Sequence, residues 1–310
     1  MVKKIIAFLA SIMPNIIRLN LYRLIGYKIG KNVKVGLLSL MLCKNVNIED
    51  DVKIGSMNVF KLNKLEIGKG SVIRSLNIFS GQKNLKLGKK TQIVGPYTFM
   101  NLAEDIEIGD YTGLGSHSIF YTHGVYLPYT QGHPRKFGKI ILGKRIWAPS
   151  HVIFLPGAKI GDDSIITVGS VISKEFPENS LISGNPARVI SKASNLKVKM
   201  DKKNLQKRMF EIIEDFSKSP LFKNCSVSKK IDYIILKNTS KYFIGIQKTK
   251  KVFDLENYKE SVIFGKGIPQ YKSKNVSTFD LEKRYAIIKG KLGQFFLKHL
   301  ERYGEYFRII

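Results

Sequence analysis

The sequence predicts a mainly β protein whose central part is a parallel β-helix, and two repeating patterns predict it. Pairs of an aliphatic residue and a glycine recur along the chain, and apolar residues recur in steps of six. A helix repeats about every 3.6 residues and a strand about every two, so neither gives a sixfold step. The pattern fits short strands that turn and return to a shared apolar shaft, three to a coil. The longest run of sixfold steps is Leu142, Ala148, Phe154, Ile160, Ile166 and Ile172.

The glycine pairs mark corners of the predicted coils. Glycine suits a corner because it tolerates a positive φ and lets two backbones approach closely. Gly161 follows Gly143 by 18 residues, the length of one coil, and earlier spacings of 20 and 21 leave room for longer corners. Each coil needs neighbours to bury its inward face, so the coils must stack. The pairs are Ile29-Gly30, Ile54-Gly55, Ile67-Gly68, Leu87-Gly88, Ile108-Gly109, Leu142-Gly143 and Ile160-Gly161.

Length and composition exclude several classes of protein. A chain of 310 residues with 44% hydrophobic and 25% charged residues can bury a core, so it is not a disordered chain. Cys43 and Cys225 are too few for a disulfide framework or a four-thiolate zinc site, and they fit a reducing compartment. Lys and Arg outnumber Asp and Glu by 52 to 24, a net charge of +28. This charge attracts polyanions without choosing between nucleic acid, anionic lipid and phosphate-bearing ligands.

Residues 1–25 predict an amphipathic helical segment that is broken at Pro14. The apolar stretch Ile5–Met13 is shorter than the roughly 20 residues of a membrane span. Lys3 and Lys4 precede it as in a signal peptide, but no small-residue cleavage site follows and basic amphipathic sequence continues. Two interpretations stay open, namely helices that pack on the protein's own core and helices that lie at a lipid interface.

Residues 26–192 make up the predicted β-helix, which has one interruption. Between Ile119 and Ile140 the sixfold pattern lapses, and we expect the intervening residues to protrude as a loop. A solenoid places such insertions outside its shaft, where loops carry function more often than stability. Turn-forming residues around Gly184 predict that the shaft ends near Ile190.

Residues 193–310 predict a small, basic α+β region. Residues 191–310 carry 27 Lys and Arg against 12 Asp and Glu, which is +15 of the total charge. Apolar spacing separates helices from strands in this region. The predicted helices are 205–216 and 292–303, and the predicted strands are 231–236, 242–246 and 261–264.

Part of the chain resembles the hexapeptide-repeat acyltransferases, in the branch with the maltose, galactoside and polysaccharide O-acetyltransferases. The resemblance is specific over residues 85–192 and looser over 26–84. It implies a left-handed β-helix, a homotrimer with active sites between its subunits, and acetyl-CoA as the usual donor. The segments that carry it are IILGKRIWAPSHVIFLPGAKIGDD at 140–163, VGSVISK at 168–174 and SGNPARVI at 183–190.

The same resemblance places the catalytic histidine at His123, at the root of the predicted loop. Imidazole suits this role because acyl transfer to a hydroxyl needs a base that is effective near neutral pH. His133 lies deeper in the loop and could contact the acceptor. His117 and His151 lie within coils, where packed or exposed histidines are ordinary, and His299 is expected to be structural.

The resemblance also implies contacts with the acceptor. Asn101 resembles the acceptor-contacting asparagine of the family, although an asparagine stacked between coils is an equally good interpretation. We expect His133 and Arg135 of the loop to bind the acceptor as well. The family often holds its histidine with a nearby loop carboxylate, but residues 125–138 contain no Asp or Glu. A backbone carbonyl, Glu104 or Asp105, or a neighbouring subunit must then orient His123.

For the donor, the resemblance implies a groove along the outside of adjacent coils. Fixed cations suit the phosphates of coenzyme A, although lysines and arginines on a solvated face are an alternative. No metal site is expected. The residues that match the family's donor contacts are Trp147, Val168, Gly169, Ser173, Lys174 and Arg188.

The sequence therefore predicts an acetyl-CoA-dependent O-acetyltransferase that modifies a sugar hydroxyl of a cell-surface polysaccharide or its precursor. The expected acceptor is a glycan, a nucleotide sugar or a lipid-linked sugar, and an amino sugar is the alternative. We expect a cytoplasmic protein with a peripheral contact to anionic lipid at the inner face of the cytoplasmic membrane. No recognised nucleic-acid motif appears.

Two other function classes stay open at this stage. The γ-type carbonic anhydrases use the same coil and bind zinc through three histidines, and His117 and His123 are six residues apart. A basic trimeric scaffold without catalysis is the second alternative.

Overall fold

The computed structural model describes residues 2–124, 127–222, 225–229, 233–237, 241–247, 253, 255, 257–265, 268, 271, 275–303 and 308–309. The chain forms two compact units, residues 1–198 and 199–310.

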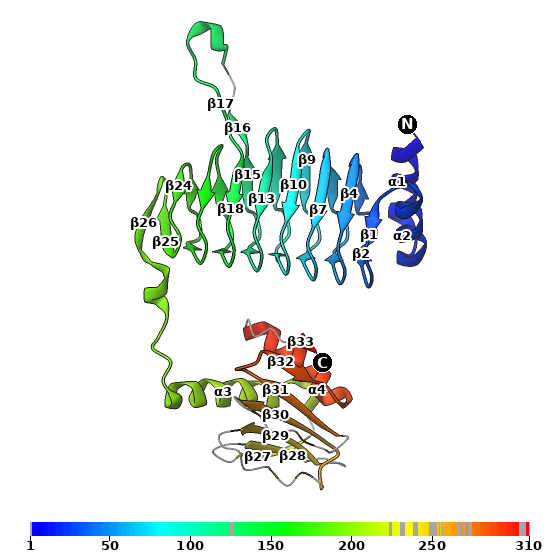
Figure 1. Ribbon diagram of the computed structural model, residues 1–310, viewed down its shortest axis with the longest axis vertical. Coiled ribbons are helices and arrows are strands. Elements are labelled where there is room, and N and C mark those ends of the chain that lie inside the picture. The colour runs from blue at the N-terminus through cyan, green and yellow to red at the C-terminus, as the bar shows by residue number, and fades with distance from the viewer. Residues whose placement is uncertain are drawn as a thin grey trace. The chain divides into compact units, whose positions relative to one another are not determined.

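In the first unit, short strands wind through three sheets in turn and form a β-solenoid (Figure 1). Within these three sheets, which we call A, B and C, neighbouring strands are parallel, except for the last two strands of sheet B. Sheet A contains β1 (Lys28–Ile29), β4 (Asn45–Ile48), β7 (Lys64–Ile67), β10 (Asn84–Leu87), β13 (Ile106–Ile108), β18 (Ile140–Leu142), β21 (Lys159–Ile160) and β24 (Glu175–Phe176).

The chain passes from sheet A to sheet B, then to sheet C and back to sheet A. Sheet B contains β2 (Lys34–Val35), β5 (Lys53–Ile54), β8 (Val72–Ile73), β11 (Gln92–Ile93), β14 (Gly113–Leu114), β19 (Trp147–Ala148), β22 (Ile165–Ile166), β25 (Ser180–Gly184) and β26 (Ala187–Lys192). Sheet C contains β3 (Leu40–Met41), β6 (Val59–Lys61), β9 (Ile78–Gly81), β12 (Phe99–Leu102), β15 (Ile119–Tyr121), β20 (Ile153–Phe154) and β23 (Val171–Ile172). Each coil is thus a triangle with a sheet on each side.

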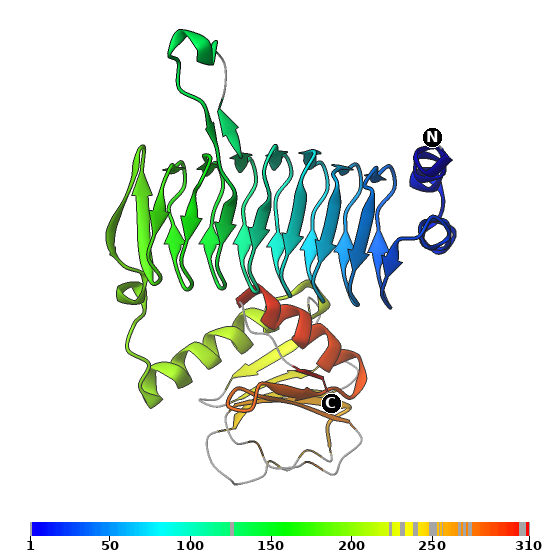
Figure 2. The ribbon, with the colours of Figure 1, turned by 45° about the horizontal axis from the view of Figure 1, so that its top comes forward.

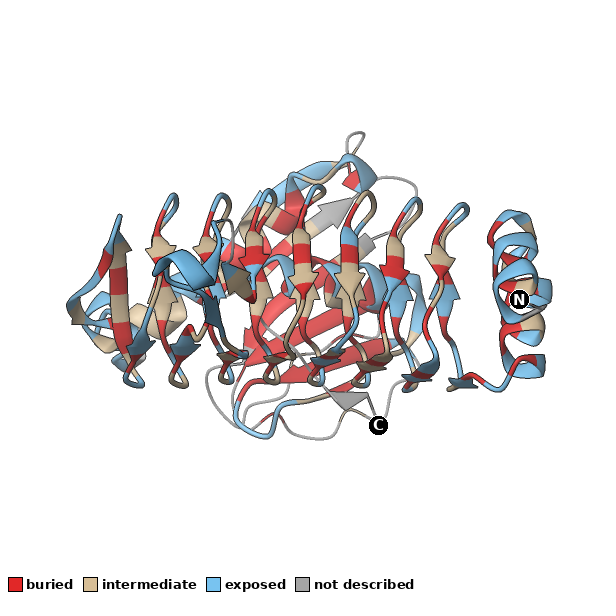
Figure 3. Ribbon diagram, turned by 90° about the horizontal axis from the view of Figure 1, so that it is seen from above, coloured by how far each residue is buried: buried red, intermediate tan, exposed pale blue. Residues whose placement is uncertain are grey.

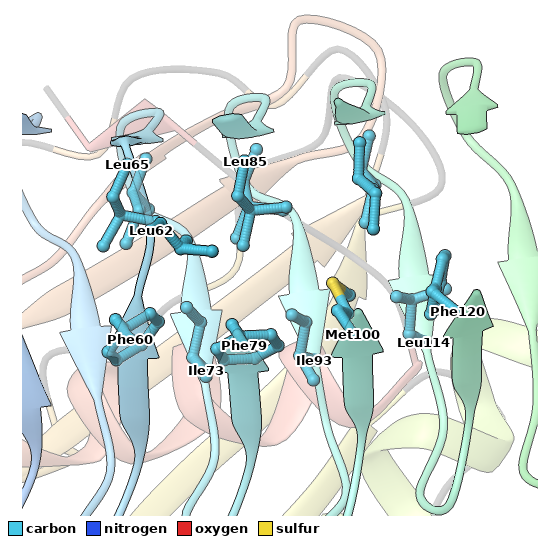
Figure 4. Close-up of a cluster of buried hydrophobic side chains, with 14 of the residues drawn as sticks. Phe60, Leu62, Leu65, Ile73, Phe79, Leu85, Ile93, Met100, Leu114 and Phe120 are labelled. Atoms are coloured by element: carbon cyan, nitrogen blue, oxygen red, sulfur yellow. The ribbon is translucent and has the colours of Figure 1, made fainter. Parts of the chain in front are cut away.

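The shaft is filled by side chains from all three sheets (Figure 4). All six residues of the long sixfold run, from Leu142 to Ile172, are buried, as the pattern predicts. Aromatic rings stack along sheet C, where Phe60 and Phe79 lie 4.9 Å apart and Phe120 and Phe154 lie 4.3 Å apart, centroid to centroid. This continuous apolar column stabilises the stack of coils, since each ring is covered by the next coil.

Close approach of successive coils explains the glycine that follows each aliphatic residue. A Cβ on Gly109 would lie 2.6 Å from the carbonyl carbon of Gly143 in the next coil, which a side chain cannot do. Positive φ angles occur instead at other corners, for example at His117 (φ 58°) and His151 (φ 63°). Of the two reasons that the sequence offers for these glycines, crowding is the one that applies.

Two helices, α1 (Val2–Ile12) and α2 (Asn15–Leu24), lie against the first coil (Figure 2). The helix pair is broken at Pro14, as predicted. Asn15 bonds to the first strand of sheet B by accepting from Val35 N at 2.9 Å, and its Nδ2 donates to Val33 O at 3.2 Å. The buried Arg18 guanidinium donates to the carbonyls of Ala10, Ser11, Met13 and Val35. These bonds join both helices to the coil.

In its described residues, the second unit contains a mixed sheet together with helical segments. Its strands follow in the order β27 (Ser226–Lys229), β28 (Tyr233–Lys237), β29 (Lys241–Gln247), β30 (Glu260–Gly265), β31 (Val276–Asp280), β32 (Tyr285–Ile287) and β33 (Arg308–Ile309). The helical segments are α3 (Lys202–Ser217), η3 (Pro220–Phe222), α4 (Gly290–Leu300) and η4 (Glu301–Tyr303).

The predicted fold class is confirmed: a mainly β chain with a parallel β-solenoid, N-terminal amphipathic helices and a C-terminal α+β region. The predicted helices correspond to α3 and to α4 with η4, and the three predicted strands to β28, β29 and β30, residues 231 and 232 lying outside the described residues. The apolar pattern of the sequence did not predict the strands β27, β31, β32 and β33. The structure divides the chain into two units between residues 198 and 199. The predicted domain boundaries at 25 and 192 stay predictions.

Candidate active site

The predicted loop leaves the solenoid at the edge between sheets C and A (Figure 1). Its root is an antiparallel pair of strands, β16 (His123–Gly124) and β17 (Lys136–Phe137), and a 3₁₀ turn, η1 (Tyr129–Gln131), lies in the projecting part. Val125 and Tyr126 lie outside the described residues. The hairpin gives the loop a fixed base, because two strands bonded to each other hold the residues of the root in register.

Thr122 fixes the backbone immediately before His123. Its buried Oγ1 donates to the carbonyl of Asn101 and accepts from the backbone N–H of Glu104, both at 2.9 Å. Its own carbonyl accepts from Gly138 N at 2.9 Å, at the far end of the loop. One side chain and its carbonyl therefore tie the loop at both ends to the preceding coil.

His123 is half-buried at this root, and its Nδ1 is buried with no hydrogen-bond partner in the part of the chain that the structure describes. Its ring lies 5.9 Å from the ring of Phe137 on the facing strand. A buried ring nitrogen without a partner is costly, so this atom is expected to have a partner beyond the described residues, in the rest of the chain or from outside it. The ring is therefore placed to take part in binding or in proton transfer.

An aromatic and cationic column continues from His123 into the loop. The exposed guanidinium of Arg135 lies 5.7 Å from the centre of the Phe137 ring and 5.3 Å from that of Tyr129. These are cation–π distances. Arg135 was predicted to bind the acceptor, whereas Phe137 and Tyr129 were missed, because only the fold of the hairpin brings them beside Arg135. His133 is half-buried in the same hairpin.

The predicted acceptor residue Asn101 lies on β12, where it is in register with Tyr121 of β15. It is half-buried. Stacked asparagines do occur between coils, but at other positions: Asn77 donates to Asn58, and Asn63 donates to Asn84. Asn101 is thus one coil away from the strand that leads to His123.

The two carboxylates considered for orienting His123 have other partners. Glu104 lies 3.5 Å from Lys83, and Asp105 Oδ1 accepts two hydrogen bonds from Asn84 at 2.9 and 3.0 Å. The described contacts of neither carboxylate include His123, so a backbone carbonyl outside the described residues or a group of a neighbouring subunit stays the expected partner of Nδ1.

The other histidines lie apart from this root. His117 and His151 are exposed at the edge between sheets B and C, with their rings stacked at 4.8 Å. His299 is buried in the second unit, and its Nε2 lies 3.2 Å from the carbonyl of Ile212. Burial lowers the pKa of His299 below its usual value. These positions fit the expectation that His117 and His151 are ordinary exposed residues of the coils and that His299 is structural.

Zinc binding by His117 and His123 on one face does not fit the geometry of the coil. A step of six carries the chain from one corner to the next, so His117 lies at the edge between B and C and His123 at the edge between C and A. Among the described residues, there is no group of three or more His, Cys, Asp or Glu side chains that could hold a metal ion.

The predicted donor residues lie on three different parts of the triangular coil. Trp147 and Arg188 are exposed on sheet B, which is the side opposite the edge of His123. The indole of Trp147 lies over Gly113, where a Cβ would approach it to 2.7 Å. Val168 and Gly169 are exposed at the edge between sheets B and C. Within a single chain, His123 therefore lies on a different part of the coil from Trp147, Arg188, Val168 and Gly169.

Ser173 and Lys174 lie instead at the edge from which the loop leaves. Lys136 of β17 donates to the carbonyl of Ser173 at 3.4 Å, a contact between the loop root and the predicted donor segment. Lys174 is exposed, with its ammonium group 5.7 Å from the centre of the Phe176 ring. The structure therefore brings Ser173 close to the root of the loop.

No family model matches the chain. The chain is similar to the galactoside O-acetyltransferase of Escherichia coli K12, with 32% identity over 134 residues, which cover 40% of this chain and 62% of that protein. It is also similar to YvoF of Bacillus subtilis strain 168, named as an acetyltransferase, with 27% identity over 135 residues, 40% of this chain and 74% of that protein. The chain thus spans less than two thirds of the galactoside enzyme.

Among solved structures, the chain is similar to the polysialic-acid-specific acetyltransferase NeuO, with 18% identity and a TM-score of 0.43. The likeness covers 60% of this chain and 93% of that one.

In the described part of the chain, no helix is long and apolar enough to cross a bilayer. Over part of its length the chain is thus similar to proteins named as acetyltransferases, and its first unit is a solenoid of parallel strands.

Proposed function

We propose that this protein transfers an acetyl group from acetyl-CoA to a sugar hydroxyl of a cell-surface polysaccharide or its precursor. The observation that carries the proposal is the half-buried His123, whose Nδ1 has no partner in the described chain and which stands at the root of the projecting hairpin. The sequence relatives named as acetyltransferases, one of them a galactoside enzyme, support the reaction and the sugar acceptor.

In the proposed mechanism, His123 is the general base. A neutral imidazole accepts a proton at one nitrogen while the other donates, so a partner at Nδ1 leaves Nε2 free to act on the sugar hydroxyl. The hydroxyl oxygen loses its proton to the ring and attacks the thioester carbonyl. The C–O bond forms, the C–S bond breaks, and the proton passes to the departing thiolate of coenzyme A.

The acceptor is proposed to bind along the hairpin. Arg135, His133 and Asn101 supply donors near the root, and the exposed rings of Tyr129 and Phe137 supply flat apolar surfaces. Flat rings and a guanidinium suit a sugar because its faces are apolar and its rim carries hydroxyls. A negatively charged sugar would gain further from the guanidinium.

The donor is proposed to bind between two copies of the chain. Trp147 and Arg188 lie on the side of the coil opposite His123, so a cleft that contains all three requires a second copy. In the homotrimer that we propose, sheet B of one copy faces the hairpin edge of the next. Trp147 then covers the pantetheine arm, Val168 and Gly169 offer backbone contacts, and Lys174 and Arg188 face the phosphates.

The experiment is an acyl-transfer assay on the purified full-length chain. Release of coenzyme A thiol from acetyl-CoA is measured with and without nucleotide sugars, lipid-linked oligosaccharides and polysaccharide fragments. The expected result is thiol release that depends on one class of acceptor and a product that gains one acetyl mass. Mild alkali removes an ester but not an amide, so the product also separates O- from N-acetylation.

Absence of acceptor-dependent release across the panel, from a chain that is folded and binds coenzyme A, would reject glycan acetylation. Release without any acceptor would indicate hydrolysis and would also count against transfer.

A further inference from the structure

The outer surface of the N-terminal helices has an unusual composition for a solenoid cap. Solenoids need terminal caps with a polar outer face, because the end of the shaft would otherwise bind another apolar surface. Here Ala7 and Ala10 of α1 and Leu19 and Tyr22 of α2 are buried. The large apolar side chains lie on the other side of both helices.

We call these side chains the apolar cap. In α1 they recur at i, i+3, i+4 and i+7, one continuous stripe of a helix. Leu38 adjoins them, since its N–H donates to the carbonyl of Ser11 at 2.8 Å. The most exposed are Ile16 and Leu24, at 76% each, and Phe8, at 59%. The apolar cap consists of Ile5, Phe8, Leu9, Ile12, Ile16, Ile17, Leu24, Leu37 and Leu38.

This cap is larger than ordinary surface apolarity explains. Single exposed apolar residues are normal, whereas contiguous patches above a few hundred Å² mark contact with a partner or a membrane. Nine large side chains, each about half exposed or more, come from two helices and the adjoining coil corner. Figure 3 shows exposed residues along both helices at this end of the coils. The cap therefore requires an occupant.

The charges of the N-terminal segment indicate which kind of partner covers the apolar cap. The first 48 residues contain no Asp or Glu and eight Lys and Arg. Arg18 is buried, and the other seven are exposed around the cap and on the first coil. They are Lys3, Lys4, Arg23, Lys28, Lys31, Lys34 and Lys44. The carboxylates of Asp50 and Asp51 bond to the corner of the first coil at Lys31 and Asn32, whereas α1 and α2 carry cations and no carboxylate. An apolar stripe on helices with cations only is the composition of helices that lie in a membrane interface rich in anionic lipid.

Protein occupants from this chain are disfavoured by the same charges. A symmetric contact with the cap of a second copy would bring the cations of α1 and α2 against those of the other copy, and like charges repel. The second unit is itself basic, with 25 Lys and Arg against 12 Asp and Glu in residues 199–310. An anionic bilayer satisfies both features, because it offers an apolar interior for the stripe and negative headgroups for the cations.

We propose that the apolar cap docks this protein on the surface of an anionic membrane, with α1 and α2 lying at the interface. The side chains of the stripe enter the headgroup region, and the exposed lysines contact lipid phosphates. Arg18 and Asn15 hold the helices to the first coil, so the solenoid is carried to the membrane with them. This docking does not depend on the acyl-transfer chemistry.

The test measures partition of the full chain onto vesicles of phosphatidylcholine, with and without added phosphatidylglycerol. The variant F8Q/I16Q removes two exposed apolar side chains and keeps good helix formers. The expected result is binding to the anionic vesicles that falls roughly tenfold or more in this variant. The matched control L196Q/V198Q changes two residues with 56% and 59% exposure outside the cap, and it should bind like the wild type.

A second pair of variants tests the charges. K3Q/K4Q should reduce the preference for anionic over neutral vesicles, and added salt should do the same. K207Q/R208Q, which removes two exposed cations from α3, should leave the preference unchanged. A preference that falls equally in both variants would indicate net charge rather than the cap and would count against the proposal.

Two further outcomes would overturn the docking. One is partition that is equal for wild type and F8Q/I16Q. The other is a wild-type particle mass that falls to a smaller assembly in F8Q/I16Q, because the cap would then be covered by copies of the chain.

Discussion

His123 illustrates how one residue acquires its setting from several segments. Thr122 ties its backbone to the preceding coil, Phe137 lies beside its ring, and no described group meets its Nδ1. The sequence pointed to this histidine by resemblance and by its place at the root of a loop. The open Nδ1 and the occupied carboxylates of Glu104 and Asp105 emerged only from the fold.

We expect His123→Ala to lower the turnover of acetyl transfer by about 10²–10⁴-fold, the usual contribution of a general base. The side chain is half-buried at a projecting edge, so the melting temperature should stay close to that of the wild type. His133→Ala is the matched control, since it removes an imidazole from the same hairpin and should mainly raise the KM for the acceptor. Full activity of His123→Ala would reject its role as base.

Arg18 is a residue whose setting was not predicted from the sequence. It lies in the basic amphipathic segment, and its side chain is buried and donates to four carbonyl groups. Burial lowers the pKa of its guanidinium. One side of the helices packs on the first coil and the other side stays exposed. The lipid-interface interpretation of this exposed side therefore stays a proposal.

At the scale of the elements, each coil is positioned by how closely it approaches the next. Backbone contact at the glycine corners sets the spacing, and the rings of sheet C fill the shaft between coils. The hairpin of β16 and β17 escapes this regularity because it leaves the stack at an edge. The rigid coil and the projecting hairpin together hold His123 at a defined place.

We expect Gly109→Ala to destabilise the solenoid by about 1–3 kcal/mol, the usual cost of forcing an extra methyl into a packed site. The added Cβ would lie 2.6 Å from the backbone of Gly143, and neither backbone can move without disturbing its sheet. Denaturant unfolding of the full chain measures the change.

Gly124→Ala is the matched control for this change, because a Cβ at Gly124 would meet no atom within 4 Å. Its stability should lie close to that of the wild type. Equal losses in the two variants would show that crowding between coils is not the reason for these glycines.

At the scale of the whole molecule, the triangular coil separates His123 from the proposed donor residues Trp147 and Arg188, whereas Ser173 and Lys174 share its edge. His123 stands at one edge and Trp147 on the opposite side, so a single chain does not bring them together. A ring of copies would do so by placing the side of one chain against the edge of the next.

Subunit mixing tests this arrangement. His123→Ala and Trp147→Ala chains are each expected to be nearly inactive, but a mixed assembly contains interfaces with both native residues. If the two variants mix at random in a ring, about a quarter of the interfaces should be intact. We expect activity to return toward that fraction after the two variants are unfolded and refolded together.

The control for this mixing experiment is each variant refolded alone, which should stay inactive. Mixed assemblies without regained activity would show that one chain supplies both residues to its own site.

The sequence by itself determined the solenoid, because a sixfold apolar step is a local pattern that only one kind of coil satisfies, and the run from Leu142 to Ile172 is buried throughout. It also located the interruption that becomes the hairpin. Tertiary structure decided which residues share an edge or a side, since a step of six moves the chain to the next corner and places His117 and His123 apart. It also decided that the guanidinium of Arg135 lies within cation–π distance of Phe137 and that Arg18 is buried. Such contacts join residues whose proximity depends on how the whole chain winds, and spacing along the sequence does not record it.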